Sequence, residues 1–303
     1  MTLWFALAAT AGEVHDGLVW TWTPETSRSW WITADVTMPR WLDLAGGKTG
    51  ATRLRSFIAD VTTTCRLGEE STKKTFDVRC TIDGFALQAR AVDAEVGRAG
   101  PLVVEAANAM AGATVTLLMS PSGRVKSVDV DGLSSDSERS QHQAESLSLI
   151  AGRVFAALDF QLPQSGSDGG GQWAIGLPQA MRTMSPSSSG TVNGVASVTG
   201  VDGVRWIIET VAKGSVTDNS SVENSGSEVG RDIYDMEMHG AATWDPQAGG
   251  LVDRKYRSDG APTAGSAAAT GVSGNPYTQI VTVRTIDPTA PISLPISGEL
   301  PPN

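Results

Sequence analysis

Charged residues are scarce in this sequence, and positive charges are the scarcer sign. They make up 18% of the 303 residues, against about a quarter of an average soluble protein. Lysine and arginine number 23 against 33 aspartates and glutamates, which gives a formal net charge of −10 at pH 7. A phosphate backbone repels so acidic a chain, so the composition argues against nucleic acid as a partner.

Histidine and long apolar runs are also rare. The three histidines, His15, His142 and His239, lie far apart, and none is near a G-x-S-x-G nucleophile elbow, which the sequence lacks. The sequence also lacks HExxH, a Walker loop and a dinucleotide G-x-G-x-x-G after a strand. We therefore expect no catalytic site, cofactor or metal. No run of 18 apolar residues occurs, so no transmembrane helix is expected.

The first eleven residues resemble a secretory signal peptide. Residues 1–11 read MTLWFALAATA, an apolar stretch followed by Ala9-Thr10-Ala11, the small-x-small pattern that precedes a signal-peptidase site. A short first strand is the alternative. The signal peptide predicts a bacterial protein outside the cytoplasm, either periplasmic or on the cell surface.

The two cysteines, Cys65 and Cys80, lie in two strand-like runs, 58–67 and 75–82, separated by a polar stretch. An antiparallel hairpin with 65 opposite 80 also places 63 opposite 82, 67 opposite 78 and 61 opposite 84, with the apolar side chains on one face. This register predicts a cross-strand disulfide, which fits export. Two buried free thiols are the alternative.

Alternation of apolar and polar residues predicts a β-rich chain. The expected strands cover 18–22, 30–38, 58–67, 75–82, 85–92, 114–119, 124–130, 173–177, 190–199, 204–211, 230–244, 251–256 and 276–286. Expected breaks include Lys213-Gly214 and Asp259-Gly260. A short helix is expected over 101–110, and spacing of three and four predicts one long amphipathic helix over 136–158, with a capping box at Ser135-x-x-Glu138.

These elements predict a β-rich α+β fold, in which an antiparallel curved sheet or half-barrel of many strands packs on the long helix. Residues 12–163 would form an N-terminal β-meander plus helix. Residues 164–286 would form a second antiparallel region, in the same domain or in another. Residues 287–303 carry five prolines and would form an extended tail.

Tryptophan is concentrated at the N-terminus: six of the nine are Trp4, Trp20, Trp22, Trp30, Trp31 and Trp41. Alternation places Trp20, Trp22 and Trp30 in the core. Trp30 and Trp31 are adjacent in a strand and must face opposite sides. We therefore expect Trp31 or Trp41 to face a ligand or an interface, and both are candidate ligand-binding residues.

The order of strands, long helix, Phe160-Gln161-Leu162-Pro163 and a glycine-containing strand with tryptophan at Gly171-Gln172-Trp173 resembles exported bacterial proteins with a lipoprotein-carrier-like half-barrel. The resemblance covers residues 110–260. It implies a curved sheet around a helix, with an apolar concavity for a lipid or for a hydrophobic segment of a partner.

The leading hypothesis is a non-enzymatic exported protein, either a carrier or a component of an envelope assembly, whose partner is an apolar small molecule or an envelope protein. The absence of a catalytic constellation and the export signals motivate it. One alternative is a carbohydrate-binding module that uses the N-terminal tryptophans. Another is a hydrolase whose acidic site is dispersed in the sequence.

Overall fold

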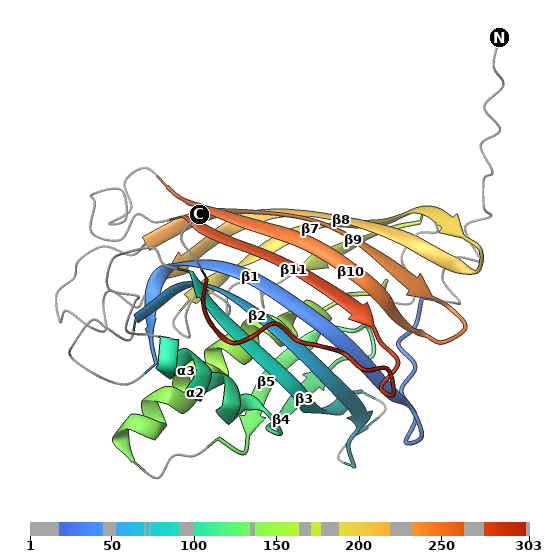
Figure 1. Ribbon diagram of the computed structural model, residues 1–303. Coiled ribbons are helices and arrows are strands. Elements are labelled where there is room, and N and C mark those ends of the chain that lie inside the picture. Colours follow the sequence, from blue (N-terminus) through green and yellow to red (C-terminus); the bar gives the residue numbers. More distant parts are fainter. Residues whose placement is uncertain are drawn as a thin grey trace.

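Eleven strands form one curved, open antiparallel sheet, a half-barrel (Figure 1). Their order across the sheet is β5-β4-β3-β2-β1-β11-β10-β9-β8-β7-β6, and β12 pairs with β3 in parallel. The computed structural model describes residues 18–44, 53–69, 71–72, 74–90, 100–133, 137–163, 171–176, 188–218, 232–263 and 276–300. The strands are β1 (Ser27–Asp43), β2 (Arg53–Leu67), β3 (Phe76–Arg90), β4 (Thr114–Met119), β5 (Val125–Asp131), β6 (Gln172–Gly176), β7 (Ser188–Asp202), β8 (Arg205–Asp218), β9 (Asp232–Asp245), β10 (Gly250–Pro262), β11 (Tyr277–Thr285) and β12 (Gly298–Leu300).

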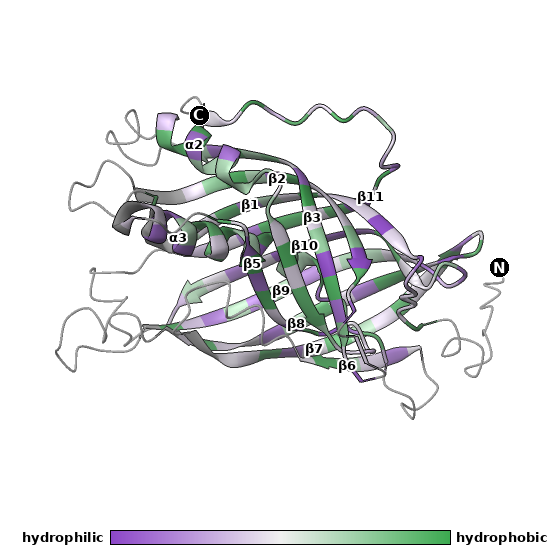
Figure 2. Cartoon of the chain, turned by 90° about the horizontal axis from the view of Figure 1, so that it is seen from below, coloured by the Kyte–Doolittle hydropathy of each residue, from purple (hydrophilic) through white to green (hydrophobic). Residues whose placement is uncertain are grey.

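Apolar and polar residues alternate along the strands of this sheet (Figure 2), and the buried apolar ones share one face. In β1, Trp30, Ile32 and Val36 are buried, whereas Trp31 and Thr33 between them are only half-buried. Because the pleat sends successive side chains to opposite sides, each strand gives alternate residues to the core. We call the side that carries Trp30 and Ile32 the concave face, and the other side the convex face.

Helix α3 (Glu138–Phe155) lies on the concave face, where it contacts β1, β2 and β5. The 3-10 turn η3 (Ala156–Leu158) continues it, so the predicted helix over 136–158 is confirmed. Leu147, Ile150 and Val154 are buried at the spacing of one helix face.

The predicted capping box at the start of α3 is wrong, although Ser135 itself lies outside the described residues. Ser137 is the N-cap instead: its Oγ accepts the Ser140 N–H at 3.1 Å, and the Ser140 Oγ accepts the Ser137 N–H at 2.8 Å. The hydroxyl of Ser140, at the third helical position, thus accepts the N–H of the N-cap residue, which is the role predicted for the Glu138 carboxylate. The shorter helix α2 (Gly100–Met110) packs on β3, close to the prediction.

Two details of the N-terminal prediction are corrected. Leu18, Trp20 and Trp22 are buried as alternation required, but they lie in an extended segment outside the sheet rather than in a strand. Strand β1 also continues through Pro39 to Asp43, beyond the predicted end at residue 38. The register between β1 and β2 shifts between Thr37 and Leu42, and such an irregularity accommodates a residue without an N–H.

The β2–β3 hairpin confirms the predicted disulfide. Cys65 and Cys80 are paired across the strands with Cα atoms 3.9 Å apart, and their sulfurs are bonded. Thr63 opposite Ile82 and Leu67 opposite Val78 are also as predicted. Beyond them a β-bulge between Thr62 and Thr63 shifts the register, so Val61 lies opposite Phe85 instead of residue 84. The bulge also joins the two expected runs 75–82 and 85–92 into one long strand.

Three strands of the second half, β7, β8 and β10, are longer than predicted. Lys213-Gly214 lies inside β8 and Asp259-Gly260 lies inside β10, where breaks were expected. The β9–β10 hairpin turns at Gly249, where φ is +55°. No helix within the described ranges is both long and apolar enough to cross a membrane.

Candidate ligand site on the concave face

The concave face of β8 and β9 includes a set of buried aliphatic and methionine side chains. Ile208, Ala212 and Val216 of β8 face this side, as do Met236 and Met238 of β9, and all five are buried. Methionine is unbranched and polarizable, so it adapts to irregular apolar partners. The described helices and η3 contact mainly β1, β2, β3, β5 and β11. The main contacts of the described helices are therefore with strands other than β8 and β9.

A glycine on the neighbouring strand makes room for one of these methionines. A Cβ atom added at Gly260 of β10 would lie 2.5 Å from the Met236 Sδ and 3.2 Å from the Cβ of Tyr277. The missing side chain of Gly260 therefore leaves the space that the Met236 thioether occupies. Asp259-Gly260 was interpreted as a turn, but Gly260 lies inside β10, where its small size allows Met236 to pack.

Aromatic rings pack together near one end of the half-barrel. Trp20 stands edge-on to Trp244 with ring centroids 5.0 Å apart, and Trp22 stands edge-on to Trp30 at 6.1 Å. The Trp20 indole N–H donates to the Phe160 carbonyl at 3.1 Å, which ties the N-terminal segment to the loop after α3. The prediction that Trp20, Trp22 and Trp30 are core residues is confirmed.

Arg28 connects the N-terminal segment that carries Trp20 and Trp22 to the β9–β10 turn. Its guanidinium donates to the carbonyls of Thr21, Ala248 and Gly249 at 2.9, 2.7 and 3.1 Å, and it lies 5.2 Å from the centroid of Trp22. Burial lowers the pKa of Arg28, while the negative charge of Asp245 opposes this effect. The contacts of this cation with an indole ring and three carbonyls stabilise the tryptophan cluster.

A polar network joins the loop after α3 to β10 and β11 within the apolar interior. The Arg254 Nη1 donates to the carbonyls of Ala157 and Asp159 at 2.7 and 2.8 Å. The Gln279 Nε2 donates to the Arg153 carbonyl at 3.2 Å, and the Tyr277 hydroxyl donates to the Gln279 Oε1. All these side chains are buried, so the hydrogen bonds offset the cost of removing them from water.

Burial also controls ionisation in this network. Burial raises the pKa of the Asp159 carboxyl to about 7, and the positive charge of Arg254 and the Val125 N–H, which donates to the Asp159 Oδ1 at 3.3 Å, partly oppose it. Burial raises the pKa of Tyr256 and lowers that of Arg254. The Arg254 guanidinium lies 4.6 and 5.4 Å from the ring centroids of Tyr256 and Phe160. These contacts anchor the loop to the sheet.

The structure places one of the two predicted ligand residues, Trp31, away from this interior. Trp31 is half-buried on the convex face, and its indole N–H donates to the Asp60 Oδ1 at 3.1 Å. Trp41 lies in β1, but its side chain is outside what the structure describes. Ligand binding by Trp31 and Trp41 stays a prediction. No group of three or more His, Cys, Asp or Glu that could hold a metal occurs within the described ranges.

The sequence interpretation missed the residues that make the interior partly polar. Arg254 stands between Asp253 and Lys255 and looks like one of three solvent-facing charges. One signal was available, because Arg254 is two residues from Tyr256 and so shares its side of the strand. The same signal was available for Gln279, which is two residues from Tyr277 in the predicted strand 276–286. Asp159 carries no such signal, because its burial depends on pairing between distant parts of the chain.

Comparison with known proteins adds information on the fold alone. No protein-family model and no curated protein sequence matches the chain. The chain is similar to a solved structure of lipovitellin that addresses lipid–protein interactions, with a TM-score of 0.50 and 8% sequence identity. The similarity covers 92% of this chain and 27% of the lipovitellin chain, so this chain spans about a quarter of that protein's length. At so low an identity, the similarity shows only that the two chains share the layout of a curved sheet.

Proposed function

We propose that this protein is a non-enzymatic lipid carrier that works outside the cytoplasm and holds the acyl chain of its ligand on the concave face of β8 and β9. The apolar lining of that face carries the proposal: the buried side chains of Ile208, Val216, Met236 and Met238 lie along two paired strands with which the described helices do not have their main contacts. Burying an acyl chain there gains roughly 25 cal/mol for each Å² removed from water.

Two further observations support the proposal. Lipovitellin, whose structure addresses lipid–protein interactions, has the same layout of a curved sheet. The Cys65–Cys80 disulfide suits an oxidising compartment such as the bacterial periplasm or the cell surface.

Fluorescence titration with cis-parinaric acid tests the binding. This polyene fatty acid accepts energy from tryptophan, and Trp244 lies on the concave side of β9. We expect saturable energy transfer in the wild type. The Met236→Gln variant places an amide in the apolar lining and should weaken binding about tenfold or more.

A matched control lies on the same strand. Ile233 is exposed on the convex face of β9, so Ile233→Gln should leave the affinity unchanged. Circular dichroism should show that both variants keep the β-sheet signal. An absence of saturable transfer in the wild type, or equal affinities for the two variants, contradicts the assignment.

Export is tested separately. When the full chain is produced in a bacterium with a periplasm, we expect it in the periplasmic fraction with a mature N-terminus at Gly12. Edman sequencing reads that terminus directly. A chain that stays in the cytoplasm with Met1 or Thr2 at its start contradicts the predicted signal peptide.

A further inference from the structure

A groove of about 880 Å³ lies on the convex face of β1, β2 and β3, whereas the proposed lipid surface is on the concave face of β8 and β9. We call it the convex groove. Its floor consists of outward-facing residues of β1, β2 and β3, among them Ser29, Thr64 and Thr81. Its roof is the chain after β11, including Ile286 and Ile292. The volume is within the range of about 300 to 1,000 Å³ that is typical of ligand pockets.

The roof is a fixed part of the structure. Residues 286–300, here called the C-terminal strap, cross the convex face from β11 to β3 (Figure 1, dark red). At the start of the strap the Ile286 N–H donates to the Ser29 carbonyl at 2.9 Å. Near its end the Ser297 Oγ accepts the Leu87 N–H at 3.1 Å, and β12 follows.

Between these attachments, the side chain of Leu294 in the strap packs against Gly84 of β3. A Cβ added at Gly84 would lie 2.9 Å from the Leu294 Cδ1, so the missing side chain of Gly84 leaves the space that Leu294 occupies. Gly84 lies next to the bulge in the β2–β3 pairing. The strap therefore has a defined register on the sheet, and the groove beneath it keeps its shape.

Hydroxyl groups cover the floor. The Ser29 and Thr64 hydroxyls lie 2.9 Å apart, and the Thr64 hydroxyl donates to the Asp83 Oδ2 at 2.7 Å, which makes a chain across three strands. The hydroxyls of Ser27 and Thr81 make no hydrogen bond with other described residues. The floor thus presents donors and acceptors that a ligand can use.

Charges of both signs line the groove in nearly equal number. Arg66 and Arg79 face each other across β2 and β3, and the acidic lining residues are Glu69, Asp83 and Asp287. Two cations against three anions leave the groove close to neutral. It is therefore poorly suited to a polyanion or to a polycation.

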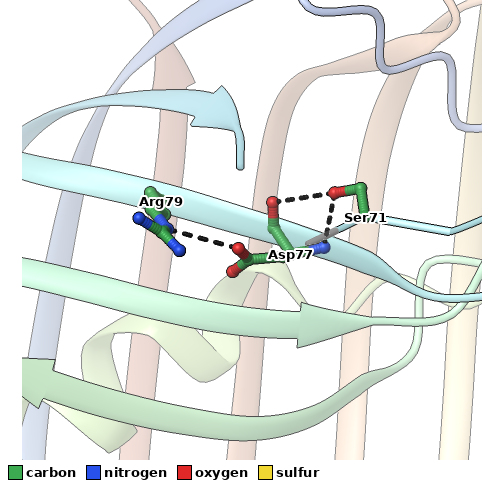
Figure 3. A network of polar contacts seen from close by, with 3 residues as sticks. All are labelled: Ser71, Asp77 and Arg79. Atoms are coloured by element: carbon green, nitrogen blue, oxygen red, sulfur yellow. Dashed lines mark hydrogen bonds and ion pairs between the residues drawn. The ribbon is translucent and has the colours of Figure 1, made fainter. Parts of the chain in front are cut away.

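Asp77 and Ser71 orient the side chain of Arg79 (Figure 3). Its Nε donates to the Asp77 Oδ2 at 3.2 Å, and the Asp77 side chain is nearly buried. The Ser71 Oγ accepts the Asp77 N–H at 2.9 Å and donates to the Asp77 carbonyl at 3.2 Å. This support orients the guanidinium, whose two terminal nitrogens then suit a pair of adjacent ligand oxygens.

We propose that the convex groove binds a neutral oligosaccharide. Each sugar hydroxyl both donates and accepts, as do the floor hydroxyls, and carboxylate and guanidinium groups bind pairs of adjacent hydroxyls. The C–H faces of the sugar rings pack against the apolar side of the strap at Pro288 and Ile292. The site is on the opposite side of the sheet from the acyl-chain surface, so the two activities are independent.

Isothermal titration calorimetry with cellotetraose, maltotetraose and chitotetraose tests this proposal. We expect saturable binding of at least one tetrasaccharide by the wild-type full chain. Thr81→Val removes one floor hydroxyl at constant shape, and Arg66→Gln removes an exposed guanidinium. Each should weaken binding about tenfold.

Thr37→Val is the matched control, because Thr37 is on the convex face of β1 outside the groove and bonds to Ser56. It should bind as the wild type does, and Met236→Gln should leave the saccharide affinity unchanged. The proposal is overturned if no tetrasaccharide binds at millimolar concentration. It is also overturned if Thr81→Val binds like Thr37→Val, or if inorganic phosphate binds more tightly than the sugars.

Discussion

Replacing Asp159 by asparagine should change how the stability of this protein depends on pH. The carboxyl is buried, and burial raises its pKa to about 7. In the unfolded chain an aspartate has a pKa of about 3.9. Between these two values the folded state keeps a proton that the unfolded state has released. Native stability therefore falls as pH rises from about 4 to 7, and it levels off above 7.

The size of the change in stability follows from the difference between the pKa values of Asp159 in the folded and unfolded states. One proton bound only by the folded state gives a slope of about 1.4 kcal/mol per pH unit, or about 4 kcal/mol across three units. Asparagine has no proton to lose. Asp159→Asn should therefore have nearly wild-type stability at pH 4 and should exceed the wild type by a few kcal/mol at pH 8. It still offers an oxygen to the Val125 N–H, which donates to the Asp159 Oδ1 at 3.3 Å.

Urea unfolding followed by tryptophan fluorescence, repeated from pH 4 to 8, measures this difference. Subtracting the two proteins cancels the other titrating groups. Asp253→Asn is the control, because Asp253 is exposed one position away from the buried Arg254. A free-energy difference between wild type and Asp159→Asn that stays constant with pH would refute the reasoning, since it would mean that no proton leaves Asp159 in this range.

Three other predictions concern stability and are checked by the same urea titration at pH 7. Replacing both Cys65 and Cys80 by alanine opens a loop with a sequence separation of 15 and should cost about 3 kcal/mol; a reductant should weaken the wild type equally and leave the double variant unaffected. Trp20→Phe leaves the buried Phe160 carbonyl without its 3.1 Å hydrogen bond and should cost about 2 kcal/mol. Ser137→Ala removes the N-cap of α3 and should cost about 1 kcal/mol, whereas Ser137→Asp should restore it.

Local pattern was sufficient for much of the fold. Alternation located the buried side of β1, and spacing of three and four located α3, because both signals depend only on neighbours in the chain. The Cys65–Cys80 pairing followed from matching two apolar runs across a short turn. These are the parts of the structure in which sequence neighbours are also spatial neighbours.

The errors arose where distant residues decide the outcome. The bulge between Thr62 and Thr63 adjusts the β2–β3 pairing at the level of Gly84, into whose space Leu294 from the far end of the chain packs. Gly260 looks like a turn residue, but it is kept small by Met236 on the next strand. Neither the bulge nor the glycine contact is visible without the paired strand.

The candidate site was the least accessible part. A concave apolar face follows from alternation, but the interior network of Arg254 and Gln279 requires knowing which strands adjoin the loop after α3. The convex groove needs the C-terminal strap to cross the sheet, and proline content indicates only that this segment is extended. Sites formed by several distant segments have no local signature.

The strand order also determines how the chain can fold. Strands β1 to β5 and β6 to β11 each pair with their neighbours in sequence, so each set can form through successive hairpins. The ladder between β1 and β11 joins them by pairing Trp30 with Thr285, residues at opposite ends of the chain. During synthesis the edge of β1 that faces the middle of the sheet has no partner until β11 emerges. We expect the joining of the two sets to be the slow step of folding, and the waiting edge of β1 to be the place where another chain can pair wrongly.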